Sequence, residues 1–211
     1  RLAGAFFLGA PLPLLDRLYV LAEVNGGIQL VVLDSATGRL EWRQQLAHVD
    51  TRTVERDSVR RLAGATPAFA DGVLVCPTSA GAVVALDLAS RSLLWGRQYA
   101  QRSTRRARAG GQTLRQAPGQ GGERWGDAAV TIANSRVLLT PVESESLYCL
   151  DLLTGKDAWP PHKRDDSLYI ACVHEGVALL VGKNQVSAIR VTDGQAAWSE
   201  VIDLAPEMPS G

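Results

Sequence analysis

The chain has 211 residues, 46% of them hydrophobic, and its 22 basic side chains balance 22 acidic ones. It is long and apolar enough to bury a core, and its zero formal net charge excludes a global attraction to nucleic acid or to an acidic surface. No apolar run has the length of a transmembrane helix, so no membrane span is predicted.

The first predicted unit, residues 1–46, ends in a motif that combines Asp34, a Thr-Gly turn at Gly38, and Trp42. The aspartate carboxylate can accept backbone N–H groups in the turn, and glycine tolerates a positive φ there. The tryptophan is predicted to open the outer strand, where its ring can wedge between sheets and donate a hydrogen bond. The motif is therefore interpreted as structural.

An insertion at residues 47–62 follows the first unit. It has an N-cap candidate and mixed charges, and Val54, Val59 and Leu62 recur at loosely helical spacing. These features predict a short surface helix.

The second predicted unit, residues 63–100, contains two apolar runs, 73–76 and 83–86, separated by a polar turn. This arrangement predicts a β-hairpin. The runs are nearly continuous in apolar character rather than alternating, which is typical of a sheet covered on both faces. The unit repeats the Asp-to-Trp motif, but Arg91 stands in place of the turn glycine.

A second insertion, residues 101–124, is rich in Gly, Gln and Arg, with six arginines and one glutamate. It has too few apolar residues to fold alone, so a long mobile loop is predicted. We favour a solvated insertion over an arm that binds anions or a partner, because basic low-complexity segments carry no specificity by themselves. For the same reason no specific nucleic-acid partner is predicted. The candidates for a binding arm are Arg102, Arg105, Arg106 and Arg108.

The third predicted unit, residues 125–163, begins with Trp125 and Asp127, and Trp125 is the one tryptophan outside the repeat. In one interpretation this aromatic and this carboxylate face a central channel and form a binding site. In the other, which we favour, the tryptophan closes the edge of the sheet and the aspartate caps a strand.

The fourth predicted unit, residues 167–202, has Arg190 in place of the motif aspartate, and residues 203–211 are predicted to start a further blade. Successive motif tryptophans are 53, 64 and 39 residues apart, so the shortest interval is close to the bare unit. A unit of about 40 residues is typical of a four-stranded propeller blade. The repeat residues are Asp34, Gly38, Trp42, Asp87, Trp95, Asp151, Gly155, Trp159, Gly194 and Trp198.

The segments Asp34–Trp42 and Asp151–Trp159, each with the pattern D-x-x-T-G-x-x-x-W, resemble the pyrroloquinoline-quinone (PQQ)-like β-propeller repeat, which is a tryptophan-docking signature. The resemblance covers nearly the whole chain. It implies an all-β partial propeller of four-stranded antiparallel blades, about four blades of a seven- or eight-bladed ring. Such a ring does not close from this chain alone, so the expected partners include the remaining blades of the same propeller or a second chain.

Two kinds of protein share this repeat: quinoprotein dehydrogenases and non-enzymatic scaffolds of the BamB-like type. We hypothesise a non-catalytic scaffold for protein–protein interaction, with recognition on the face that bears the insertions. The resemblance implies the periplasm or cell envelope. The alternatives are a fragment of a PQQ-dependent dehydrogenase, with PQQ and calcium as cofactors, and a sensor domain of a larger signalling protein.

The cysteines and histidines favour the scaffold hypothesis. A dehydrogenase of this type is expected to have a vicinal cysteine pair, whereas the three cysteines of this chain are isolated from one another on apolar runs. They are predicted to be buried thiols, and a single disulfide between two of them is the alternative. No histidines have paired metal-ligand spacing, so neither a metal nor a cofactor is predicted. The residues concerned are Cys76, Cys149, Cys172, His48, His162 and His174.

Overall fold

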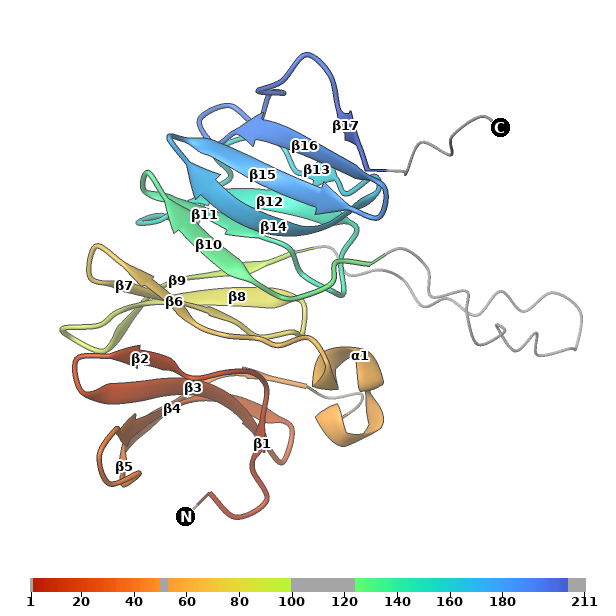
Figure 1. Cartoon of the computed structure of the whole chain (residues 1–211). Coiled ribbons are helices and arrows are strands. Elements are labelled where there is room, and N and C mark those ends of the chain that lie inside the picture. The colour runs from red at the N-terminus through yellow and green to blue at the C-terminus, as the bar shows by residue number, and fades with distance from the viewer. Residues whose placement is uncertain (1, 50–52, 100–123, 205–211) are drawn as a thin grey trace, which may run out of the picture.

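A computed structural model of the chain describes residues 2–49, 53–99 and 124–204 (Figure 1). Within these residues the backbone forms four antiparallel sheets that follow one another in chain order. The predicted all-β partial propeller is confirmed, and each sheet is one blade.

Each blade runs from an inner to an outer strand, and consecutive strands are mostly hydrogen-bonded neighbours. The inner strand of blade 1 is split into two pieces, which both pair with the same second strand. The strands are, in blade 1, β1 (Phe6–Phe7), β2 (Leu12–Leu14), β3 (Arg17–Val24), β4 (Gly27–Asp34) and β5 (Leu40–His48); in blade 2, β6 (Ala68–Ala70), β7 (Val73–Pro77), β8 (Ala82–Asp87) and β9 (Ser92–Gln98); in blade 3, β10 (Val130–Ala133), β11 (Arg136–Leu139), β12 (Ser146–Asp151) and β13 (His162–Lys163); and in blade 4, β14 (Ser167–His174), β15 (Val177–Gly182), β16 (Gln185–Arg190) and β17 (Ile202–Asp203).

Tight two-residue turns join the first two strands of blades 2, 3 and 4. In blade 2 the turn is Asp71-Gly72, with φ angles of 49° and 81°. Blades 3 and 4 use Asn134-Ser135 and Glu175-Gly176, which also have positive φ at both positions. Two consecutive positive φ values are the signature of a type I′ turn, whose twist matches that of the flanking strands. The hairpin turns predicted at these positions are confirmed.

The tryptophans do not open the outer strands as predicted. Trp42 and Trp95 lie inside β5 and β9, which begin two and three residues earlier. Trp159 and Trp198 lie before β13 and β17. In blade 3 two prolines follow the tryptophan, and proline cannot donate a hydrogen bond to the ladder, so pairing resumes only beyond them.

The first insertion folds into a 3₁₀ turn, η1 (Val54–Arg56), and one turn of helix, α1 (Ser58–Arg61). The carboxylate of Asp57 caps α1 by accepting the backbone N–H groups of Val59 and Arg60. The predicted helix is therefore present, but it is not confined to the surface. Val54 is 1% exposed and Arg60 is 6% exposed, because both are held against neighbouring blades.

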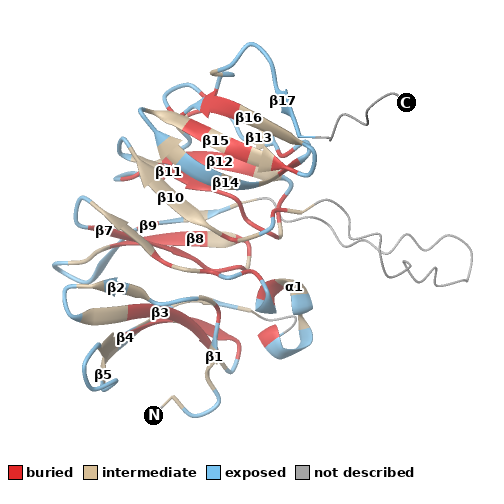
Figure 2. Ribbon diagram, in the orientation of Figure 1, coloured by how far each residue is buried: buried red, intermediate tan, exposed pale blue. Residues whose placement is uncertain are grey.

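The core lies between the blades. One cluster of buried side chains extends through all four, from Leu21 in blade 1 through Leu74 and Leu138 to Ile189 in blade 4. Figure 2 shows the buried residues concentrated in middle strands such as β3, β8 and β12. Every residue of β7 is buried, which confirms the two-sided burial predicted from its continuous apolar run.

Candidate interaction face and blade junctions

Trp95 joins blade 2 to blade 3. Its indole Nε1 donates a hydrogen bond of 2.9 Å to the carbonyl of Leu152, and its ring lies against Gly155. A Cβ atom at Gly155 would lie 2.5 Å from Cδ2 of Trp95, and the φ of +66° also favours glycine. The tryptophan of one blade therefore docks on the Thr-Gly turn of the next blade.

Trp159 makes the same junction between blades 3 and 4. Its Nε1 donates to the carbonyl of Val191 at 3.1 Å, and a Cβ at Gly194 would lie 2.9 Å from its Cδ2. Trp159 is only 5% exposed, so its ring packs between blades and presents no surface to a ligand.

The junction between blades 1 and 2 uses a variant of this contact. Arg91 occupies the glycine position with a φ of 58°. Its guanidinium carbon lies 5.1 Å from the ring centroid of Trp42, within the range of a cation–π interaction. Trp42 also meets Tyr19 of its own blade edge to face. A charged side chain over the indole thus replaces the close glycine contact.

The motif aspartates organise the turns that follow the third strands, including the two on which Trp42 and Trp95 dock. A carboxylate oxygen of Asp34 accepts the hydroxyl and the backbone N–H of Thr37, and Asp151 does the same for Thr154. In both, the side-chain hydrogen bond is the first cause of a lowered pKa, because it favours the charged carboxylate. Asp87 accepts equivalent bonds from Ser90.

In blade 4, where arginine replaces the motif aspartate, the turn is held differently. The guanidinium of Arg190 pairs with the carboxylate of Asp193 at 3.0 Å, and Asp193 also accepts the backbone N–H of Gln195. That backbone hydrogen bond is the first cause of a lowered Asp193 pKa, followed by the bond from Arg190. The Thr-Gly type of turn therefore survives the loss of its usual carboxylate.

The opposite end of the blades carries the insertions, and we call it the insertion face. It is formed by the turns between the second and third strands and by the chain that leaves each outer strand. Four backbone hydrogen bonds tie these parts together: Val49 N–H to Gly26 O, Tyr99 N–H to Gly81 O, Arg164 N–H to Glu145 O, and Leu204 N–H to Asn184 O. Figure 1 shows α1 at this end of the array, beside blades 1 and 2.

A buried ion pair fixes the first insertion to the blades. Arg60 of α1 donates to Oε2 of Glu23 in β3 at 2.6 Å, and its Nε donates to the carbonyl of Ser79 at 2.8 Å. The second oxygen of Glu23 accepts the backbone N–H of Val54 at 2.9 Å. The two charged side chains are 7% and 2% exposed. One pair thus connects blade 1, the insertion and the β7–β8 loop of blade 2.

Arg164 is a second buried arginine on the insertion face, between blades 3 and 4. It is 4% exposed. Its guanidinium donates to the carbonyls of Ser167 and Arg124 at 2.6 and 3.3 Å. It therefore holds the entry into blade 4 against the chain that leads into blade 3. Neither Arg60 nor Arg164 was predicted from the sequence, because no local pattern distinguishes a buried arginine from an exposed one.

Glu143 links the loops of blades 2 and 3. Its Oε1 accepts the hydroxyl of Tyr99 at 2.6 Å and the backbone N–H of Gly81 at 3.0 Å. Its Oε2 is buried and has no hydrogen-bond partner within the described part of the chain. Burial first, and then the charge of Glu143, raises the pKa of Tyr99 well above its usual value.

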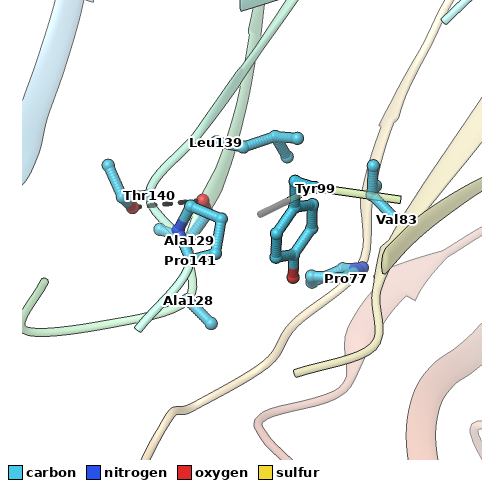
Figure 3. A pocket seen from close by; sticks show the side chains of 8 residues that line it. All are labelled: Pro77, Val83, Tyr99, Ala128, Ala129, Leu139, Thr140 and Pro141. Atoms are coloured by element: carbon cyan, nitrogen blue, oxygen red, sulfur yellow. Dashed lines mark hydrogen bonds between the residues drawn. The ribbon is translucent and has the colours of Figure 1, made fainter. Parts of the chain in front are cut away.

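A small pocket lies beside Tyr99, between blades 2 and 3 (Figure 3). Figure 3 shows the ring of Tyr99 between Pro77 and Val83 on one side and the segment around Pro141 on the other. The free space accommodates about one water molecule. The lining residues are Pro77, Val83, Tyr99, Ala128, Ala129, Leu139, Thr140 and Pro141.

The two candidate residues at the start of blade 3 are engaged by the chain itself. Trp125 is 3% exposed, and its indole N–H donates to the carbonyl of Ser146 at 3.2 Å. Asp127 accepts the backbone N–H of Ala129 at 3.2 Å. The two side chains thus bond to different parts of blade 3. The other four candidates, Arg102, Arg105, Arg106 and Arg108, lie outside the described residues.

The cysteines are all free thiols. Cys76 and Cys149 are buried as predicted, and burial raises the pKa of both, that of Cys149 to about 12. Cys172 is exposed, which corrects the prediction of burial. It pairs with Leu179 on the face of blade 4 that no other blade covers. Across residues 2–49, 53–99 and 124–204, no three His, Cys, Asp or Glu side chains form a metal-binding group.

The comparisons with known proteins agree on the fold. A family model described as outer membrane protein assembly factor BamB matches residues 2–118. No curated protein sequence matches the chain. Among solved structures, the chain is similar to BamB from Moraxella catarrhalis, with a TM-score of 0.62 and 14% identity over 92% of this chain and 50% of that one.

Two other structures are similar. A europium-containing methanol dehydrogenase has a TM-score of 0.56 and 15% identity, over 94% of this chain and 43% of that one. The computationally designed Ika4 protein has a TM-score of 0.53 and 14% identity, over 88% of this chain and 91% of that one. The chain therefore spans about half the length of the BamB structure and less than half of the dehydrogenase. At these identities the likenesses show the fold alone.

Proposed function

The chain belongs to the family described as outer membrane protein assembly factor BamB, and from that premise we propose that it is a non-catalytic scaffold for protein–protein interaction in the bacterial cell envelope. The match of the family model to residues 2–118 is the observation that carries this proposal. No helix in the described residues is long and apolar enough to cross a membrane. The family assignment predicts that the full-length protein, tagged at its C-terminus, fractionates with the periplasm or envelope, and recovery in the cytoplasm alone would contradict the assignment.

We place the recognition surface on the insertion face. The Glu23–Arg60 pair holds the insertion in a fixed position, so its outward side chains need little ordering when a partner binds. Those side chains include Glu55, Arg61 and Leu62, the last of which is 77% exposed. A mixed-charge surface with an exposed leucine and an arginine suits a protein partner better than a polyanion.

A crosslinking experiment tests this placement. A photoreactive residue at Leu62 should give defined crosslinks to envelope proteins, and an added R61E substitution should weaken them. The matched control is Leu153, which is 65% exposed but lies in the Thr-Gly turn at the other end of blade 3. Equal crosslinking from both positions, or none from Leu62, would remove the insertion face as the recognition surface.

The likeness to a methanol dehydrogenase keeps one alternative open, a fragment of a PQQ-dependent dehydrogenase. Trp125 and Asp127, the aromatic and carboxylate considered for a channel site, are engaged by Ser146 and Ala129. As they stand, they do not fit a pair that stacks on a quinone and binds calcium. Addition of PQQ with calcium should therefore give neither cofactor absorbance nor dye-linked alcohol oxidation; either result would favour the enzyme.

A further inference from the structure

The junction between blades 1 and 2 leaves a tryptophan donor unused. In the next two junctions the indole N–H groups of Trp95 and Trp159 donate to the carbonyls of Leu152 and Val191. Trp42 is the corresponding residue of blade 1, but within residues 2–49, 53–99 and 124–204 its indole N–H has no hydrogen-bond partner, and its side chain is only half-buried. All strands of blades 1 and 2 lie within the described residues, so this feature does not depend on either end of the chain.

The side chain of Arg91 explains why the indole of Trp42 has no backbone acceptor. The turn on which it docks has the same kind of backbone hydrogen bond as the other junction turns, here from Leu88 N–H to Gly72 O. At Gly155, a Cβ atom would lie 2.5 Å from the ring of the docking tryptophan. Arg91 carries such a Cβ atom at the same position of its turn, so the ring of Trp42 cannot approach the backbone as closely.

The guanidinium of Arg91 also has donors to offer. Its carbon lies 5.1 Å from the ring centroid of Trp42. A guanidinium held over an aromatic ring keeps the N–H groups in its own plane available for a planar acceptor such as a carboxylate. In the part of the chain that the structure describes, Arg91 makes no ion pair and no hydrogen bond, and the nearby carboxylate of Asp87 is engaged by Ser90. Two kinds of donor therefore lie together without an acceptor.

An apolar side chain and open space lie beside these donors on β9. Leu93 is 58% exposed and pairs with Leu86, and Gly96 pairs with Val84. Leu86 and Val84 belong to the core cluster that blade 2 shares with blade 1. Because cross-strand partners share a face of the sheet, Leu93 and Gly96 lie on the side of β9 that faces blade 1. Nothing lies within 4 Å of the missing Cβ of Gly96, so this side has room for another side chain.

The outer edge of β9 lacks the charges that usually protect such an edge. β9 is the last strand of its sheet, and residues 92–96 include no charged side chain. In blade 1 the residue before the tryptophan is Glu41, which pairs with Arg17. In blade 2 the residue before Trp95 is Leu94, which is 42% exposed. An uncharged edge strand with exposed leucines is suited to pairing with an extended segment of another chain.

We propose that these residues form a binding site for an extended segment of a protein partner that carries a glutamate or aspartate beside a large apolar side chain. The carboxylate accepts hydrogen bonds from the guanidinium of Arg91 and from the indole N–H of Trp42, and it is the complementary group because one of these donors is cationic. The apolar side chain packs on Leu93 in the space at Gly96. We call this surface the rim site, and its residues are Trp42, Arg91, Leu93, Leu94 and Gly96.

The rim site is separate from the recognition surface proposed above. Trp42 and Arg91 lie at the end of the blades that carries the Thr-Gly turns, opposite the insertion face. The two proposals can therefore fail independently. R91A should not change the crosslinks formed from Leu62, and R61E should not change binding at the rim site.

Titration with a synthetic peptide tests the site. The probe is acetyl-Thr-Val-Glu-Leu-Thr-amide, and the full-length protein is labelled with ¹⁵N-tryptophan, with W42F to identify the indole resonance of Trp42. This resonance should shift and saturate as peptide is added, whereas those of Trp95 and Trp159 should stay in place. Glutamine in place of the peptide glutamate, or R91A in the protein, should weaken binding at least about tenfold, because hydrogen bonds to a charged group contribute that much.

The variant R91G separates the site from folding in general. Glycine stands at this position in the turns of blades 3 and 4, so R91G keeps the turn and should let Trp42 reach the carbonyl of Leu88. Peptide binding should then be lost, and the indole proton of Trp42 should exchange with solvent more slowly. The matched control is R43A. Arg43 is exposed and adjacent to Trp42 on β5, so its side chain points to the opposite face of the sheet, and its removal should leave binding unchanged.

Four results would overturn the proposal. They are a Trp42 resonance that does not move at about 5 mM peptide, equal binding of the glutamate and glutamine peptides, an R43A variant that loses as much affinity as R91A, and an R91G variant that binds the peptide like the wild type.

Discussion

The buried Glu23–Arg60 pair makes the strongest prediction about stability. The substitution R60A removes the cation from beside the carboxylate of Glu23, whose side chain is 2% exposed. Of the hydrogen bonds to this carboxylate described above, only the one from the backbone N–H of Val54 then remains. The carbonyl of Ser79 loses the Arg60 Nε donor as well. Breaking one side of a buried pair typically costs 3–5 kcal/mol, because the other charge stays buried without compensation.

The expected result is a loss of about 3–5 kcal/mol in the free energy of unfolding, or roughly 6–20 °C in Tm for a chain of this size. Urea unfolding followed by far-UV circular dichroism measures the first value, and the slope m shows whether the transition stays cooperative. The matched control is R61A, the next residue on the same helix. Arg61 is exposed, so its substitution should stay within about 0.5 kcal/mol.

The double variant E23Q/R60M distinguishes the pair from packing in general. It removes both charges and keeps most of the side-chain volume, so it should recover most of the stability lost in R60A. Equal stabilities of R60A and R61A would refute the reasoning, and so would a double variant no more stable than R60A.

Three further predictions concern the repeat and the thiols. G155A should destabilise the folded chain clearly more than G64A. Both glycines have a positive φ, but only at Gly155 would the added Cβ lie 2.5 Å from the ring of Trp95. The Tm values of the two variants measured by thermal unfolding test this. The lowered pKa of Asp151 means that its ionised carboxylate stabilises the folded chain. This contribution is complete above the ordinary carboxyl pKa of about 4, and it is lost as the pH falls through the lowered pKa of the folded chain. D151N should therefore be less stable than wild type at pH 7, with the difference shrinking below pH 4. A thiol reagent at pH 8 should label the exposed Cys172 in the folded chain and reach the buried Cys76 and Cys149 only after denaturation, as mass spectrometry would show.

The sequence predicted the features that depend on local backbone geometry. The turn at Asp71-Gly72 needs positive φ, and glycine with a short polar neighbour is the residue pair that provides it. The repeat spacing predicted the blades in the same way. The predicted start of the outer strand was wrong in all four blades, because the motif fixes the turn and the indole but not the residue at which the ladder resumes.

The buried side chains of the insertion face could not be predicted in this way. Glu23 and Arg60 are separated by 37 positions, and neither stands in a pattern that marks it as buried. Cys172 illustrates the reverse error, since an apolar strand run indicates burial only when a neighbouring blade covers that face. Such residues depend on contacts between blades, which a single repeat does not contain.

The two ends of each blade therefore obey different constraints. At the Thr-Gly turns, an indole must reach a backbone carbonyl across a missing Cβ, so the residue at Gly155 is determined by geometry. On the insertion face the blades are joined by side chains, such as Arg60 on Glu23 or Tyr99 on Glu143, whose identities follow no period. Loops on that face can then change sequence without disturbing the junctions, because the close contacts of Trp95 and Trp159 lie on other turns. This separation allows one propeller framework to present a variable recognition surface.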